Sequence, residues 1–141
     1  DLHSFPTRRS SDLLINIRVL VCYDLRFPVW NRYTEENPFE LLVYTANWPK
    51  DRIDVWDTLL KARAIENQAF VCAANAVGRD AYKVYHNGHS CVRDVRGELI
   101  LSFDDDRIAA KTVELDLAFQ RKIRERFPVL NDMDKFHINV E

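Results

Sequence analysis

Three short apolar runs constrain the fold of this chain more than any other feature. Residues 17–23 read IRVLVCY, residues 40–45 read ELLVYT and residues 70–74 read FVCAA. Runs this short with few polar residues are typical of strands buried on both faces, as in a parallel sheet. Residues 54–69, between the second and third runs, contain strong helix formers and no Gly or Pro, which predicts a helix. The alternation predicts an α/β architecture.

Shorter elements are expected in the remaining sequence. Pro28 favours the first turn of a short helix that ends near Asn37, before Pro38. The other expected elements are a polar loop at 78–88, strands at 90–94, 99–103 and 110–115, and a final helix through Phe119, Ile123 and Phe127. Together with the buried runs they predict a mixed sheet.

Composition excludes several classes of partner. The chain has 141 residues, with 20 Lys plus Arg against 22 Asp plus Glu, so its formal net charge is -2. A chain without a basic excess is not expected to bind nucleic acid. No window reaches the roughly 18 apolar residues that a membrane-spanning helix needs, so no membrane partner is expected. The odd number of cysteines, at spacings unlike a CxxC framework, favours a reducing compartment and a cytoplasmic location.

Residues 1–13, DLHSFPTRRSSDL, differ from everything that follows. They have neither a helical nor a strand period, and they resemble the translation of a common sequencing-library adapter. The alternative is a short polar N-terminal arm. We expect residues 1–13 to be a non-native segment and the native domain to occupy residues 14–141.

Cys22 is the candidate nucleophile. It ends the first apolar run immediately before a polar turn, which is where α/β sheets expose reactive side chains. A base and a positive charge would have to lower its pKa, because the thiolate is the reactive species. From position alone a buried structural cysteine is favoured. Cys72 and Cys91 lie in the middle of predicted strands and are interpreted as core residues.

The remaining polar candidates have simpler interpretations. Arg63 and Glu66 lie three positions apart on the predicted helix, as a surface ion pair or as a buried polar pair, and an architectural role is favoured for them. The three loop or tail histidines, His86, His89 and His137, are interpreted as solvated. Together with Cys72 and Cys91, His86 and His89 lack the ligand spacing of a zinc site, so no metal is expected.

Several motifs together resemble the nitrilase superfamily of carbon-nitrogen hydrolases. They are VCYDLRFPVW, ANWP, KARAIENQAFV, the GHS turn with its following VRDVRGE, and the tail FPVLNDMDKF. The match spans Ile15 to Ile138. Within that superfamily the motifs look most like the bacterial ω-amidase branch, which hydrolyses the ω-amide of 2-oxo-dicarboxylic acid monoamides such as 2-oxoglutaramate.

The resemblance implies a four-layer αββα sandwich that forms a homodimer, with a Glu, Lys and Cys catalytic set and no metal or organic cofactor. In that superfamily the Glu and the Lys precede the nucleophile, and residues 14–21 contain neither. Residues 14–141 are therefore expected to be the C-terminal part of a single carbon-nitrogen hydrolase domain. Alone, they are expected to be inactive.

The resemblance also implies roles for residues of this sequence. Cys22 matches the nucleophile, and the backbone N–H of Tyr23 is then an oxyanion donor. Asn47 and Trp48 are expected to border the acyl pocket.

Two further roles concern charged residues. Arg26 either attracts a substrate carboxylate or pairs with Asp24. The resemblance gives Glu66 a structural place, in agreement with the interpretation of the pair that it forms with Arg63.

The expected function is the hydrolysis of a linear carboxylate amide to the acid and ammonia through a cysteine thioester, with a small-molecule amide as the substrate. This is a hydrolase reaction on carbon-nitrogen bonds other than peptide bonds. One alternative is another carbon-nitrogen hydrolase, acting on an N-carbamoyl or nitrile substrate. The other is a non-catalytic binding or assembly module, which the missing Glu and Lys would permit.

Overall fold

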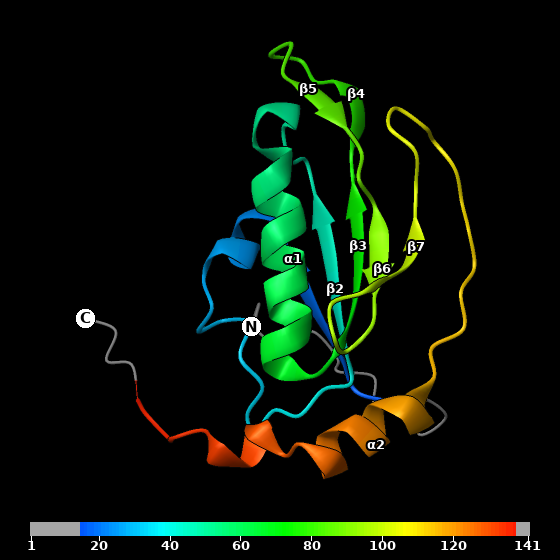
Figure 1. The fold of residues 1–141 in the computed structure, drawn as a ribbon. Helices are drawn as coiled ribbons and strands as arrows, with labels where there is room; N and C mark the ends of the chain where they lie inside the picture. The colour runs from blue at the N-terminus through cyan, green and yellow to red at the C-terminus, as the bar shows by residue number, and fades with distance from the viewer. Residues whose placement is uncertain (1–14, 138–141) are drawn as a thin grey trace, which may run out of the picture.

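A computed structural model describes residues 15–137 of the chain. The non-native segment predicted for residues 1–13 lies outside these residues. The centre of the fold is a five-stranded sheet in the order β1-β2-β3-β6-β7 (Figure 1). Its strands are β1 (Ile17–Val21), β2 (Leu41–Ala46), β3 (Phe70–Asn75), β6 (Cys91–Arg93) and β7 (Leu99–Ser102). The first three are parallel, and β6 and β7 continue the sheet in antiparallel pairing. The predicted α/β class and mixed sheet are confirmed.

Helices and short turns surround this sheet. The helices are α1 (Ile53–Asn67) and α2 (Leu117–Arg126), and the single-turn 3-10 helices are η1 (Cys22–Arg26), η2 (Lys50–Arg52) and η3 (Val129–Asp132). Helix α1 lies along one face of the sheet, and α2 lies across the end of the sheet opposite the β4–β5 hairpin (Figure 1). Strands β4 (Val77–Arg79) and β5 (Tyr85–Asn87) form that separate hairpin. In residues 15–137, no helix is both long and apolar enough to cross a membrane.

The main core lies between α1 and the sheet. Side chains from α1, β2 and β3 are fully buried there, including Trp56 and Leu60 from the helix and Leu42, Tyr44 and Val71 from the strands. Alternate residues of a strand point to opposite faces, so one side chain in two from each strand packs on α1. Burial of apolar area against the helix holds the three parallel strands in register.

The opposite face of the sheet is only partly covered. A row of apolar side chains crosses it in register, comprising Val19, Val43, Cys72, Val92 and Leu101. Val19 is 64% exposed, and Ile17 and Val21 beside it are also exposed. The expectation that β1 is buried on both faces is therefore wrong for these residues. Strand β1 is an edge strand, and one of its faces has no covering layer in residues 15–137.

Two predicted elements are absent and one was missed. The segment after Pro28 forms a turn rather than a helix, because side chains bind its backbone: Arg18 donates to the Arg32 carbonyl, and Asn67 accepts from the Tyr33 N–H. Residues 110–115 alternate like a strand but pair with no strand among the residues described. The predicted loop at 78–88 contains the β4–β5 hairpin.

Candidate active site

Cys22 lies at the junction between β1 and η1. Its φ is +43°, in the left-handed region that a residue with a Cβ adopts at a cost of about 1–3 kcal/mol. The N–H of Val21 donates to the Asp24 carboxylate at 2.8 Å and closes the turn around Cys22. This turn ends the strand abruptly and leaves the Cys22 side chain half-buried at the carboxyl edge of the sheet.

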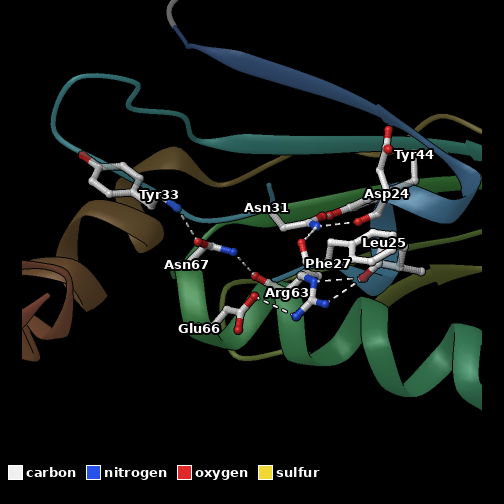
Figure 2. A network of polar contacts seen from close by, with 9 residues as sticks. All are labelled: Asp24, Leu25, Phe27, Asn31, Tyr33, Tyr44, Arg63, Glu66 and Asn67. Atoms are coloured by element: carbon white, nitrogen blue, oxygen red, sulfur yellow. Dashed lines mark hydrogen bonds and ion pairs between the residues drawn. The ribbon is translucent and has the colours of Figure 1, made fainter. Parts of the chain in front are cut away.

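The buried side-chain amide of Asn31 also holds this turn in place. The Nδ2 of Asn31 donates to the carbonyl of Asp24 at 2.7 Å and to that of Phe27 at 2.5 Å, and its Oδ1 accepts from the Tyr44 hydroxyl (Figure 2). Burial raises the pKa of that hydroxyl, so it stays protonated and remains a donor. Because Asn31 and Tyr44 are both fully buried, water cannot replace these hydrogen bonds.

Helix α1 supplies a third anchor through Arg63. Its guanidinium donates to the Leu25 carbonyl from Nε at 3.2 Å and from Nη2 at 2.7 Å, and Nη1 binds Glu66 Oε1 at 2.9 Å (Figure 2). Arg63 is 3% exposed, whereas Glu66 reaches solvent. The pair lies on one face of α1 and ties that helix to η1.

The carboxyl ends of the three parallel strands meet around an open hollow of about 450 Å³. Its lining residues are Val21, Cys22, Thr45, Ala46, Asn47, Ala74, Asn75 and Ala76. Ligands of open α/β sheets bind outside the carboxyl ends of the strands. Cys22 is the one thiol in this lining, and Thr45, Asn47 and Asn75 supply polar groups beside it.

Asn47 and Trp48 occupy different positions. The exposed Asn47 borders the hollow, whereas the Trp48 side chain is 3% exposed and packs on Trp56 at a ring distance of 5.5 Å. The Trp48 indole N–H donates to the Arg52 carbonyl at 2.8 Å. Trp48 thus lies in the core, and its backbone carries the loop that presents Asn47.

Arg26 stacks on Trp48. Its guanidinium carbon lies 4.9 Å from the centre of the indole ring, a cation–π arrangement. Among residues 15–137 the ion pairs do not include Arg26 with Asp24. Asp24 is engaged instead by the N–H of Val21. The guanidinium donors of Arg26 are therefore not committed to that carboxylate.

Tyr23 follows Cys22 in η1, is not among the residues that line the hollow, and exposes its side chain. It is the second residue of η1, so its N–H lies in the first turn, where amides have no partner within the helix. The Tyr23 ring is 65% exposed and packs edge-to-face on Phe27 at 5.2 Å.

The other two thiols lie away from the hollow. Cys72 is half-buried on the partly covered sheet face, and burial raises its pKa. Cys91 is buried, and burial raises its pKa to about 11. Both are neutral near pH 7, as the core interpretation requires.

Two histidine interpretations are wrong. His86 is buried, and the His89 ring lies between two carboxylates, with Nδ1 at 2.7 Å from Asp57 and Nε2 at 2.9 Å from Asp105. Their solvation was inferred from a polar loop, but the loop folds as a hairpin against η2. Within the part of the chain that the structure describes, His, Cys, Asp and Glu side chains form no group of three that could hold a metal ion.

Sequence reasoning missed two polar residues that support the site, Asn31 and Asn75, and it gave Asp24 only as a possible partner of Arg26. One signal was available for Asn75, because it directly follows the apolar run FVCAA and so marks the carboxyl end of a buried strand. Asn31 gave no such signal, since its role depends on carbonyl groups brought together only by the folded turn.

The sequence and the fold both match known proteins. The family model of carbon-nitrogen hydrolases matches residues 3–125. The omega-amidase YafV of Escherichia coli strain K12 is 45% identical over 119 residues, which are 84% of this chain and 46% of that protein. The 2-oxoglutaramate amidase of Bacillus subtilis is 38% identical over 116 residues, covering 82% and 44% respectively.

A solved structure agrees with these matches. A CN-hydrolase superfamily protein from Xanthomonas campestris, crystallised with an arsenic adduct in its active site, superposes with a TM-score of 0.82. It is 40% identical, and the match covers 87% of this chain and 48% of that one. The chain spans about half the length of the curated relatives it matches. By its family match, its relatives and its fold, the chain belongs to the carbon-nitrogen hydrolase family.

Proposed function

We propose that the protein carrying this chain hydrolyses the linear amide of a short carboxylate to the acid and ammonia, with Cys22 as the nucleophile. The observation that carries the proposal is the position of Cys22, held in a left-handed backbone at the carboxyl edge of three parallel strands and facing an open hollow. The arsenic adduct in the active site of the Xanthomonas campestris protein supports a thiol there, because soft elements prefer thiolate ligands.

The reaction proceeds in two steps. A base takes the Cys22 proton and the thiolate attacks the amide carbon. The base then returns that proton to the amide nitrogen, so ammonia leaves as a thioester forms. Water then cleaves the thioester, which releases the acid and restores the thiol. The N–H of Tyr23 stabilises the negative charge on the carbonyl oxygen during both steps, since it lies next to the nucleophile in the first turn of η1.

The base and a lysine come from another part of the protein. Residues 14–21 contain neither Glu nor Lys. We place residues 14–141 in the C-terminal part of a single hydrolase domain, whose remaining part supplies the Glu and the Lys and covers the open sheet face as the second half of a four-layer sandwich. The relatives support this division, because they are about twice as long as the matched segment.

The substrate is the ω-amide of a 2-oxo-dicarboxylic acid, such as 2-oxoglutaramate. The omega-amidase and 2-oxoglutaramate amidase relatives support this choice. Arg26 is the candidate group for the distal carboxylate, since its guanidinium stacks on Trp48 and not against Asp24. Asn47 borders the acyl part of the pocket.

The complete enzyme is a cytoplasmic homodimer in this proposal. Free thiols at Cys22, Cys72 and Cys91 support a reducing compartment. Tyr23, Phe27 and Trp30 expose large apolar side chains on one short segment, which favours contact with a second copy. A Trp30→Glu variant of the complete protein should then run as a monomer by light scattering, and a stable dimer would contradict this interface.

Ammonia release from 2-oxoglutaramate by the complete protein tests the reaction. Cys22→Ala is expected to abolish release, whereas Cys72→Ala, a thiol outside the hollow, should retain it. Ammonia release that persists in the Cys22→Ala variant would contradict the mechanism. A panel that also contains N-carbamoyl and nitrile substrates tests the class of substrate, and decarbamoylation without turnover of 2-oxoglutaramate would select the other carbon-nitrogen hydrolase activity.

A further inference from the structure

Asn75 makes an unusual set of contacts at the end of β3. Its Oδ1 accepts from the Trp48 N–H at 2.6 Å, and its Nδ2 donates to the Trp48 carbonyl at 3.0 Å and to the Gly88 carbonyl at 2.7 Å. We propose that Asn75 is a positioning residue, whose amide fixes the Asn47–Trp48 loop at the wall of the Cys22 hollow and so controls substrate affinity. The inference rests on the proposed function of that hollow.

Only an amide satisfies these three partners. The Trp48 N–H needs an acceptor, and the two carbonyls need donors. The side chain must therefore accept one hydrogen bond and donate two. Asn75 is 8% exposed, which leaves little room for water to substitute. An aspartate of the same shape would accept from the Trp48 N–H but would direct a carboxylate at two carbonyl oxygens.

The 88–90 turn, whose Gly88 carbonyl accepts from the Asn75 side chain, is itself firmly held. The His89 carbonyl in this turn accepts from the Trp56 indole N–H at 3.1 Å. The His89 ring bridges Asp57 on α1 to Asp105. The 88–90 turn is thus bound to α1, and Asn75 transmits that rigidity to the loop carrying Asn47.

This arrangement separates the substrate wall from the reacting atoms. Asn47 precedes Trp48 in the chain, and Arg26 stacks on the Trp48 ring, so loosening Trp48 displaces both proposed substrate contacts. Cys22 and Tyr23 lie on the β1–η1 turn, which Asn31 and Arg63 hold through other hydrogen bonds. Loss of the Asn75 amide should therefore raise KM more than it lowers kcat.

Steady-state kinetics of the complete protein tests this split. Asn75→Asp is expected to raise KM for 2-oxoglutaramate by about tenfold or more, with kcat within about threefold of the parent. Ser90→Ala is the matched control, because it removes the contact to the Asn75 backbone and leaves the side-chain contacts in place. An unchanged KM in Asn75→Asp, a loss confined to kcat, or an equal rise in Ser90→Ala would overturn the proposal.

Hydrogen exchange on the unaltered complete protein gives a test that needs neither turnover nor a folded variant. The Trp48 N–H should exchange about a hundredfold or more slower than an unprotected amide, because Asn75 is its acceptor. Exchange at the unprotected rate would contradict the hydrogen bond from the Trp48 N–H to Asn75 and would overturn the proposed positioning role. If no amide is hydrolysed but the Trp48 N–H is protected, the proposed function fails and the positioning contact stands.

Discussion

Cys22 has a left-handed backbone conformation although it carries a Cβ, and the surrounding hydrogen bonds maintain this conformation. The Asp24 carboxylate holds the residue before Cys22, and Asn31 and Arg63 hold carbonyls after it. In the proposed function, a strand-to-helix turn fixed in this way keeps the thiol in one place before the substrate arrives. Preorganisation of this kind lowers the cost of reaching the transition state.

Arg63 should matter far more to stability than its ion-pair partner. Arg63→Met leaves the buried Leu25 carbonyl without its two donors, so we expect the free energy of unfolding of the complete protein to fall by about 2–4 kcal/mol. Glu66→Gln should cost under about 1 kcal/mol, because this side chain is 40% exposed and its amide oxygen can still accept. Urea denaturation measures both, and equal losses would contradict the structural role of the Leu25 contact.

Thiol alkylation should be selective for Cys22. Burial raises the pKa of Cys72, and that of Cys91 to about 11, so at pH 8 only about one Cys91 in a thousand is a thiolate. Brief treatment of the complete protein with iodoacetamide at pH 8 is expected to label Cys22 first, as read by peptide mass spectrometry. Because a raised pKa delays ionisation, Cys91 labelling should increase only as the pH approaches 11. Equal labelling of the three thiols at pH 8 would contradict this ordering.

Single residues were predictable from sequence where position along a strand decides their place. Cys22 lies at the end of the first apolar run and Asn47 follows the second run, and both line the hollow. Their proposed roles in the reaction came from the resemblance and not from position. Trp48 follows the same run but is buried in the core, because its large ring packs on Trp56. Asn31 and Asn75 could not be assigned roles, since their partners are backbone groups of segments distant in sequence.

Among the elements, the tight turn between β6 and β7 depends on a glycine that lies against α1. Gly97 has a φ of +80°, and a Cβ there would lie 2.7 Å from Lys61 Cγ and 3.0 Å from Ile65 Cγ1. Gly78 has a φ of +102°, but a Cβ there would meet nothing within 4 Å. A side chain at either position would thus pay the cost of a left-handed backbone, but only a Cβ at Gly97 would overlap α1.

Gly97→Ala is expected to lower the free energy of unfolding of the complete protein by about 2–4 kcal/mol, which combines the left-handed backbone with the overlap against α1. Gly78→Ala should cost only the backbone term of about 1–2 kcal/mol. Thermal or urea denaturation of both variants gives the difference. A cost at Gly78 equal to that at Gly97 would show that the approach to α1 contributes nothing.

Elements with a strong local pattern were predicted well, and those that depend on tertiary partners were not. The three parallel strands and α1 lie within a few residues of their predicted bounds, because apolar runs and helix formers specify them locally. The helix after Pro28 failed because Arg18 and Asn67 bind the backbone of that segment. The strand at 110–115 has no partner strand in the described part of the chain.

For the molecule as a whole, the uncovered sheet face is the main consequence of the architecture. Ile17, Val19 and Val21 expose apolar surface on an edge strand, which favours association with other chains. The chain expressed alone is therefore expected to aggregate and to show no amidase activity. A monodisperse, active preparation of the chain alone would contradict this expectation.

Val19→Lys distinguishes the open sheet face of the isolated chain from the covered face proposed for the complete protein. In the isolated chain it should reduce aggregation measured by light scattering, because a charge on an edge strand opposes pairing. In the complete protein it should lower the free energy of unfolding by about 2–4 kcal/mol, because the face is then covered. Tyr82→Lys, at a residue 89% exposed on the β4–β5 hairpin, is the control and should change neither. Unchanged stability of the complete Val19→Lys protein would contradict the proposed covering layer.

The most direct test of the central proposal is to trap the covalent intermediate on Cys22. The complete protein is mixed with 2-oxoglutaramate, quenched in acid within one turnover, and digested for mass spectrometry. We expect the Cys22 peptide to gain the mass of the substrate minus ammonia, and the gain to disappear in Cys22→Ala. Turnover of the amide with an unmodified Cys22 peptide, or an acyl group on Cys72 or Cys91 instead, would contradict the assignment of Cys22 as the nucleophile.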